Sequence, residues 1–405
     1  MKTFIIFFLI LILLSGCSKQ QKNKVDVVPV IAVNFPNNQT KIHLNDIAKN
    51  VSFIRLETNG DCLIRGVSKL EIYDDRMFVF YSGLTGSHLY CFDLQGKFLF
   101  KVGGIGQGPG EYRSLNDFAI DIENGCLWLV DDTKKILKYD LNGKFVEQYS
   151  TDFSIMNLCM IDASESLMAI RLGFNPDNNH SLLIYSLTDK KNHYQKESEI
   201  INLTRVVVTN TFYKSKERLI YAEPFNDTIF TVTKENIEPY YVIDFGKRKL
   251  PKDLFINPQP QNVIEQLTNP DNKYSGLAMN PKEISNVLFF DYYYSGKKII
   301  AIYLRESKNV ISINEFLFIG KAFEASKCYF HAKQDNQFIC FLPANLLIEE
   351  ITPVKKKQQL DYGSYSDITE LLPNLREDDN PVMVIGELNI DTLIKLSSGL
   401  ETPKQ

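Results

Sequence analysis

Two segments near the front of the chain read almost as copies of each other: LYCFDLQGKF at 89–98 and ILKYDLNGKF at 136–145. Asp93 and Asp140 are 47 residues apart, and so are Gly96 and Gly143. A period of this length is typical of one four-stranded propeller blade rather than of a βαβ unit. The repeat therefore predicts the architecture of the chain, but it predicts neither a reaction nor a ligand.

Strand patterns with turn signals recur along the rest of the chain. The second copy ends in Asn142-Gly143, and Asn-Gly between apolar strands favours a hairpin because both turn positions need positive φ. Degenerate copies follow at 183–187 and 229–232, a fifth blade at 287–290, 298–304, 310–313 and 316–319, and a sixth at 328–331, 337–342 and 381–388. The sequence predicts an all-β, six-bladed β-propeller, with four, five or seven blades as alternatives.

A propeller ring must be closed, because otherwise its first and last sheets expose unpaired edges. The alternating segment at 51–56 lies near the N-terminus, and the strand at 382–386 arrives late in the chain. We expect these two strands to share one blade. Two stretches, about 247–286 and 344–379, interrupt the rhythm and are expected to be insertions with short helices on one face, either functional or decorative.

The N-terminus has the form of a secretion signal. Lys2 precedes an unbroken apolar run at 4–14, which is too short to span a bilayer, and Leu-Ser-Gly-Cys follows at 14–17. This ending resembles the lipobox of bacterial lipoproteins, which implies a signal peptide at 1–16 and a lipid on Cys17. We expect a tether at 17–40, the propeller at 41–395 and a C-terminal tail at 396–405.

The residues after Cys17 bear on which side of the membrane the protein faces. In lipoproteins of Bacteroidota, acidic residues soon after the cysteine accompany export to the cell surface. Here the nearest acidic residue is Asp26, preceded by three lysines. The resemblance therefore implies a lipid anchor in the cell envelope, most simply in the outer membrane facing the periplasm.

A glycine-rich loop carries a second resemblance. The segment GGIGQGPGEY at 103–112, the Tyr221-x-x-x-Phe225-x-Asp227-x-Ile229 pattern and the ending NPVMVI at 380–385 are similar to the six-bladed β-propeller lipoproteins of Bacteroidota, relatives of NHL-repeat propellers. The resemblance covers nearly the whole mature chain. It implies a fold and an envelope location but no reaction, since members of this family mostly have no assigned activity.

The glycine loop itself is interpreted as a tight crossing between blades, because glycine adopts positive φ at no steric cost. Phosphate cradling is disfavoured, since no Gly-Lys-Ser/Thr follows and the spacing is not GxGxxG. Four residues near this loop are candidates for a binding site at the channel mouth: Glu111, Tyr112, Arg113 and Asp131.

The remaining residues exclude or disfavour several kinds of chemistry. A net charge of -4 argues against nucleic acid as a partner. The five histidines share no metal-binding spacing, a Gly-x-Ser-x-Gly elbow is absent, and no catalytic residue is named. Calcium held by Asp131, Asp132 and Asp121 is the one cofactor hypothesis, although no EF-hand-like spacing supports it.

Cysteines and tyrosines are both interpreted as packing residues. Beyond Cys17, six cysteines lie in or beside strand-like runs without a CxxC pair, which favours buried free thiols over disulfides. The runs Tyr240-Tyr241 and Tyr292-Tyr293-Tyr294 are compatible with sugar stacking, but packing between blades is the simpler interpretation.

Together these observations favour a lipid-anchored, non-enzymatic binding or scaffold module of the cell envelope. Its expected partners are the membrane, through the lipid, and an envelope protein, peptide or glycan. The alternative is an envelope enzyme of the lyase, lactonase or glycosidase type, with carboxylates and a metal ion in the propeller channel. That alternative rests on analogy between folds.

Overall fold

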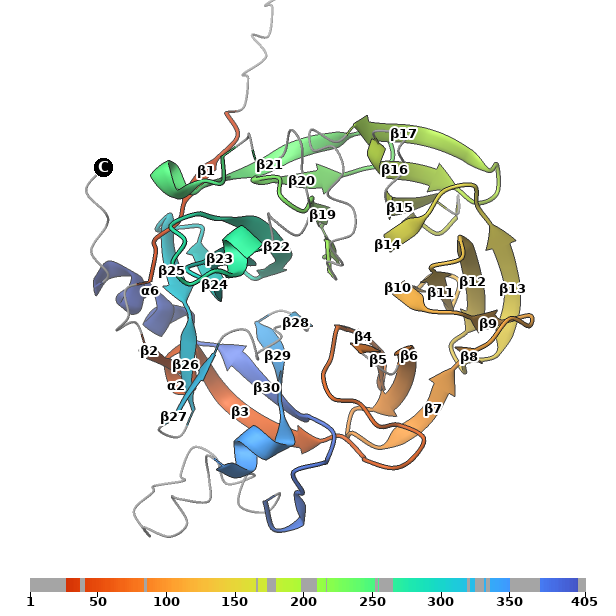
Figure 1. Ribbon diagram of the computed structural model, residues 1–405, viewed down its shortest axis with the longest axis horizontal. Coiled ribbons are helices and arrows are strands. Elements are labelled where there is room, and N and C mark those ends of the chain that lie inside the picture. The colour runs from red at the N-terminus through yellow and green to blue at the C-terminus, as the bar shows by residue number, and fades with distance from the viewer. Residues whose placement is uncertain are drawn as a thin grey trace, which may run out of the picture.

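The computed structural model describes most of the chain, namely residues 27–36, 41–83, 86–164, 167–172, 180–197, 210–215, 217–251, 254, 265–318, 321–324, 331–332, 336–349 and 372–399. The strands form a ring of six antiparallel blades, which confirms the predicted β-propeller (Figure 1).

The first three blades each take four consecutive strands. Blade one contains β4 (Lys69–Tyr73), β5 (Arg76–Gly83), β6 (Gly86–Asp93) and β7 (Phe98–Val102). Blade two contains β10 (Leu115–Asp121), β11 (Cys126–Asp131), β12 (Lys135–Asp140) and β13 (Phe145–Ser150). Blade three contains β14 (Ile155–Asp162), β15 (Leu167–Leu172), β16 (His180–Ser186) and β17 (Lys191–Glu197).

The next two blades depart from the expected strand positions. Blade four contains β18 (Phe212–Lys214), β19 (Leu219–Ala222), β20 (Thr228–Val232) and β21 (Ile237–Asp244). Blade five contains β22 (Ser275–Ile284), β23 (Val287–Tyr294), β24 (Lys297–Leu304) and β25 (Asn309–Ile313). Its innermost strand, β22, was expected to lie inside an insertion. The polar and proline residues of β22 concealed it, and two register shifts against β23 accommodate them.

The segment expected as the fourth strand of blade five also differs. Residues 315–318 form β26, which pairs in parallel with β2 (Lys41–His43) and antiparallel with β27 (Lys321–Glu324). The fourth position of blade five belongs to β25 instead. An apolar run of four residues does not specify which neighbour it pairs with, so this small additional sheet was not predicted.

Blade six closes the ring with strands from both ends of the chain. Its order is β28 (His331–Ala332), β29 (Gln337–Leu342), β30 (Val382–Leu388) and β3 (Ala48–Arg55). The register pairs Phe53 with Val384 and Arg55 with Val382. The predicted partnership of the two terminal strands is therefore confirmed.

Asn380 fastens this closure. Its side-chain Oδ1 accepts a hydrogen bond from the Ile64 backbone N–H at 2.7 Å, and its Nδ2 donates to the Glu57 and Cys62 carbonyls at 2.7 and 2.6 Å. The side chain is fully buried. It thus satisfies three backbone groups of the segment that leads from β3 into blade one.

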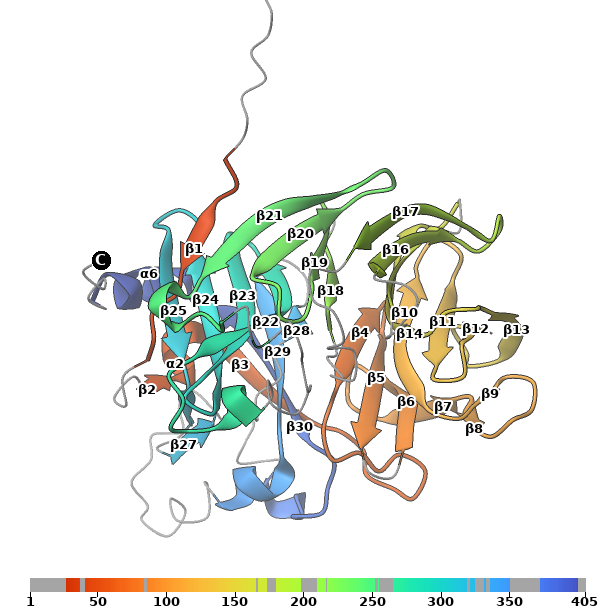
Figure 2. The ribbon, with the colours of Figure 1, turned by 45° about the horizontal axis from the view of Figure 1, so that its top comes forward.

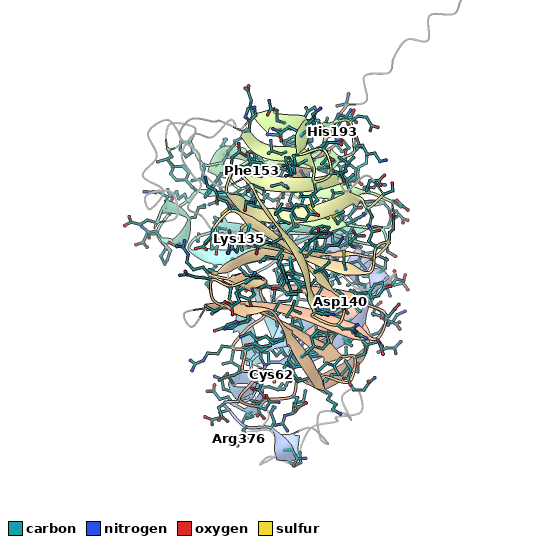
Figure 3. The ribbon with its side chains drawn as sticks, turned by 90° about the vertical axis from the view of Figure 1, so that its right-hand side faces the viewer. Cys62, Lys135, Asp140, Phe153, His193 and Arg376 are labelled. Carbon is teal, nitrogen blue, oxygen red and sulfur yellow. The ribbon has the colours of Figure 1, made fainter. Side chains whose placement is uncertain are left out.

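The ring has two unlike faces. The turn face carries the hairpin turns that join the first strand of a blade to the second and the third to the fourth. The loop face carries the connections between second and third strands and those between blades. In an edge-on view, Lys135, Phe153 and Arg376 lie on the loop face, and Asp140 and His193 lie on the opposite, turn face (Figure 3).

The N-terminal segment lies along the outside of the ring instead of forming a free tether up to residue 40. β1 (Val30–Ala32) pairs in parallel with β21 and adds a fifth strand to blade four (Figure 2). The chain continues through β2 and α2 (Leu44–Ile47) into β3, and α6 (Ile390–Gly399) packs against α2 and β25. Ile31 is only 1% exposed, because its side chain faces the core between blades four and five.

Apolar side chains fill every interface between neighbouring blades. Six clusters of buried residues correspond to the six interfaces of the ring. Five cysteines are free thiols, as expected, and four of them are buried: Cys62, Cys91, Cys126 and Cys340. Cys328 lies outside the described residues.

We predict that Asn380→Ala lowers the free energy of unfolding by about 3 kcal/mol, because three buried backbone groups lose their partner. Denaturant unfolding followed by circular dichroism measures the loss. Asn374→Ala is the matched control, since Asn374 is exposed and its recorded hydrogen bond uses the backbone carbonyl. Equal stability of the two variants would contradict the role of Asn380 in closing the ring.

Candidate functional site

Charged side chains on the innermost strands of blades one and two meet where these blades adjoin. Lys69 and Glu71 lie on β4, and Asp117 lies on β10. The Lys69 Nζ is 3.0 Å from Asp117 Oδ1 and 3.1 Å from Glu71 Oε1, and it also donates to the Phe118 carbonyl at 2.5 Å. The ammonium group thus meets two carboxylates inside the ring.

Asp117 links blade two to blade three. Its Oδ1 accepts from the Phe118 N–H at 2.8 Å, and its Oδ2 accepts from the Leu158 N–H at 3.1 Å and from Asn157 Nδ2 at 3.3 Å. Only 3% of Asp117 is exposed. Both carboxylate oxygens are therefore engaged, and the residue acts as a fastening between blades.

The titration of this group follows from its surroundings. Burial disfavours the charge of Lys69, but the Asp117 and Glu71 carboxylates outweigh that effect and raise its pKa. Burial raises the pKa of Glu71, although Lys69 and the Ile120 N–H act in the opposite direction. Because the pKa of Lys69 is raised on folding, its ion pairs stabilise the fold below the ordinary lysine pKa, and this contribution is lost at alkaline pH.

Contacts across the channel connect blades that are distant in sequence. Near the loop face, Asn210 Nδ2 donates to the Ser68 carbonyl at 2.7 Å and so joins blade four to blade one. Lys214 Nζ donates to the Met160 and Ile161 carbonyls at 2.8 and 3.3 Å. The channel is thus crossed by hydrogen bonds and lined by charges that pair with one another.

The structure gives Glu111 and Tyr112 positions in the glycine loop itself. β8 (Gly104–Ile105) and β9 (Glu111–Tyr112) form a short parallel pair beside β7 and β13, on the outside of the ring (Figure 1). Glu111 Oε2 accepts from the Gly108 N–H at 2.7 Å. Tyr112 is fully buried, and its hydroxyl donates to the Val102 carbonyl at 3.3 Å. Neither residue lies at the channel mouth, where the sequence had placed it.

The loop is the predicted tight crossing between blades. Gly103 and Gly110 have φ of 63° and 74°, and a Cβ on Gly110 would meet the ring of Phe145 at 2.6 Å. Only glycine combines that conformation with that approach. Tyr139 donates to the Gly110 carbonyl, which holds the loop against blade two.

Arg113 and Asp131 shape the connection that follows. Arg113 forms a two-pronged ion pair with Asp132, whose closest distance is 2.7 Å. Asp131 is fully buried and accepts hydrogen bonds from the backbone of Arg113, Thr133 and Lys135. The buried Asp131 carboxylate therefore stabilises this turn through hydrogen bonds with the backbone.

The calcium hypothesis does not survive the geometry. Asp121 pairs with Cys126 at one end of the β10–β11 hairpin, whereas Asp131 pairs with Leu115 at the other end. Asp121 instead accepts hydrogen bonds from Asn124 and from the Trp128 indole. Among the described residues no group of three or more His, Cys, Asp or Glu side chains could hold a metal ion.

Sequence reasoning missed the residues of the channel. Lys69, Asp117, Asn157 and Arg171 are polar residues in largely apolar strands, which was the available signal. It was not used because they lie in different blades and share no spacing. The interpretation of the tyrosines as packing residues holds for Tyr292, which is fully buried. Its hydroxyl forms hydrogen bonds with the Asn34 carbonyl and with Ser312 Oγ, both at 2.9 Å.

We predict that Asp117→Ala lowers the free energy of unfolding by about 3–5 kcal/mol. The substitution leaves buried Lys69 with one carboxylate in place of two, and it leaves the backbone N–H groups of Phe118 and Leu158 without this acceptor. Asp132→Ala, which removes the half-exposed partner of Arg113, should cost much less, because exposed ion pairs remain hydrated. Chemical denaturation of both variants provides the comparison. An Asp117→Ala variant as stable as Asp132→Ala would refute the fastening role.

Comparisons with known proteins agree with this fold. A family model described as a domain of unknown function, DUF4934, matches residues 26–387. A Bacteroides fragilis protein provisionally assigned as exported has a similar structure, with a TM-score of 0.68 and 18% identity over 89% of this chain and 99% of that one. No curated protein matches the sequence.

Two other solved structures are less similar. BamB from Moraxella catarrhalis has a TM-score of 0.38 and 9% identity, covering 73% of this chain and 75% of its own. The WD40 repeats of RRP9 have a TM-score of 0.43 and 10% identity, covering 85% and 99%. Within the described residues no helix is long and apolar enough to cross a membrane.

Proposed function

The chain belongs to the family described as a domain of unknown function, DUF4934. From its N-terminal sequence and the geometry of its propeller, we propose that it is a lipid-anchored binding module of the cell envelope. In this proposal Cys17 carries the lipid and the loop face receives an envelope partner. The provisional assignment of the similar Bacteroides fragilis protein as exported supports the location.

The arrangement of the connections carries this proposal. Hairpin turns of a few residues occupy the turn face, whereas the long connections, among them residues 56–68, 103–114, 245–274 and 343–381, join strands at the loop face. Loops on a rigid scaffold are where binding residues concentrate. The channel supports binding over catalysis as well, because Glu71 and Asp117 are already engaged with Lys69 and backbone N–H groups.

The direction in which the N-terminal segment enters the ring supports an orientation with the turn face toward the membrane. β21 runs from the turn face toward the loop face, and β1 is parallel to it. Residues 27–29 therefore lead into β1 from the side of the turn face. A lipid on Cys17 would hold the turn face toward the membrane and leave the loop face free, within the roughly 40 Å that a twelve-residue stretch spans when extended.

We predict that Cys17→Ser releases the protein from the membrane fraction, because the signal and the fold remain but the acyl chains are lost. Fractionation of cells that express either form measures the distribution between membrane and soluble envelope fractions. Cys62→Ser serves as the control, since Cys62 is buried in the propeller. Continued membrane attachment of Cys17→Ser would contradict lipid anchoring.

We predict that a photo-crosslinking amino acid at Arg65, exposed on the loop face, captures an envelope partner in cells. The same amino acid at Asp75, exposed in a hairpin turn of the turn face, should capture none or mainly lipid. Gel mobility and mass spectrometry of the adducts distinguish the two positions. Capture of a protein or glycan from position 75 alone would reverse the proposed orientation.

A further inference from the structure

Three side chains from distant parts of the sequence meet at the rim of the loop face. Arg248 ends η1 (Gly246–Arg248), a short helix that follows β21. Phe35 follows β1, and Tyr294 is the last residue of β23. Since β1, β21 and β23 all run from the turn face toward the loop face, these side chains reach the same rim, between blades four and five.

Two aromatic rings hold the guanidinium of Arg248. Its Cζ lies 4.9 Å from the centre of the Phe35 ring and 4.9 Å from the centre of the Tyr294 ring. The two ring centres are 4.8 Å apart, and both rings pack against the core between blades four and five. A cation over aromatic faces gains a cation–π interaction, which fixes the position of the guanidinium without using its N–H donors.

The N–H donors of Arg248 are not engaged by a neighbouring carboxylate. Within the described residues, the Arg248 side chain forms no hydrogen bond and no ion pair. Asp244, the acidic residue closest in the sequence, accepts a hydrogen bond from the Gly246 N–H through Oδ1 at 2.7 Å. Asp227 pairs with Lys249 Nζ at 2.5 Å. The guanidinium is therefore oriented but unpaired.

The same rim carries two further basic residues and is open to solvent. Lys247 and Lys249 are exposed, and Arg248 is partly exposed. No ion pair of Lys247 occurs in the part of the chain that the structure describes. A ligand can therefore reach these groups at the surface and needs no cavity. We call Phe35, Lys247, Arg248, Lys249 and Tyr294 the rim cluster.

The chemistry of the rim cluster favours a carboxylate carried by a polypeptide. A carboxylate meets the edge of a guanidinium through two parallel hydrogen bonds, and adjacent ammonium groups attract further carboxylates. A sugar ring would gain most by stacking on an open aromatic face, but Arg248 already lies over both Phe35 and Tyr294. An acidic peptide segment needs only the basic groups, which remain accessible.

We propose that the rim cluster binds an acidic segment of an envelope protein, with a carboxylate of that segment on the Arg248 guanidinium. The proposal rests on the binding role proposed above, and it names the chemistry of the partner at one part of the loop face. Because opposite charges attract through solvent at this exposed site, the association should weaken as salt is added.

The test measures binding of an amidated, fluorescein-labelled hexaglutamate peptide to the full chain, purified in nonionic detergent at neutral pH. Fluorescence anisotropy gives the dissociation constant at low and at high ionic strength. The labelled hexaglutamine peptide is the matched neutral probe, and unlabelled hexagalacturonate is a competitor with the same number of side-group carboxylates on sugar rings. We expect hexaglutamate to bind more weakly at high salt, hexaglutamine not to bind, and hexagalacturonate to compete at least about tenfold more weakly than unlabelled hexaglutamate.

Substitutions locate the site. Arg248→Gln should weaken hexaglutamate binding by about tenfold, because it removes a charge-assisted, two-pronged contact. Tyr294→Leu should also weaken binding, since it removes a ring that orients the guanidinium, whereas Tyr294→Phe keeps the ring and should bind within about twofold of the wild-type chain. Lys97→Gln removes an exposed charge from the turn face and should leave the dissociation constant unchanged. Circular dichroism establishes that each variant is folded.

Four results would overturn the inference: no binding of hexaglutamate to the wild-type chain, equal binding of hexaglutamine, competition by hexagalacturonate as strong as that by hexaglutamate, or a folded Arg248→Gln variant that binds like Lys97→Gln. Each of these results would leave crosslinking at Arg65 and fractionation of Cys17→Ser unaffected. Failure of the partner assignment is therefore distinguishable from failure of the proposed envelope function.

Discussion

The pairing of β3 with β30 is the interaction on which the rest of the structure depends. Each blade shares its apolar cores with its two neighbours, so an open ring would expose the apolar side chains on both sides of blade six and the edge of its sheet. The closure joins residues more than 300 positions apart, and Asn380 adds three buried hydrogen bonds to it. Packing of the other five interfaces requires this contact, because their geometry is set by a complete circle.

The closed ring also determines what its channel can do. Lys69 and Glu71 on β4 meet Asp117 on β10 only because neighbouring blades converge on one axis. Their mutual pairing compensates the cost of burying charge, and it leaves no free carboxylate among these three for acid–base chemistry. Our proposal therefore places binding on the loop face, where the long connections between strands lie.

Sequence reasoning predicted the elements that repeat local chemistry and, from the need to close the ring, the pairing of the two terminal strands. It missed other elements whose pairing is irregular or whose position depends on the tertiary fold. The hairpins around Gly96 and Gly143 were recognisable because the two turns have similar sequences. In the structure both glycines have positive φ, as such turns require. β22 was not recognised, since its irregular pairing with β23 disguises the alternation of a strand. Glu111 and Tyr112 were expected at the channel mouth, but the glycine crossing carries them to the outer side of the ring.

The sequence by itself determined the blade period, the turn chemistry, the closure by two terminal strands and the packing character of the cysteines. These properties follow from spacing, from alternation and from the conformational freedom of glycine, all of which are written locally in the chain. Only the tertiary structure decided which polar side chains meet, as Arg171 meets Asn157 and Lys196 meets Glu223. The reason is physical: such encounters depend on the register of strands in neighbouring blades, and a one-residue shift would turn each side chain to the opposite face.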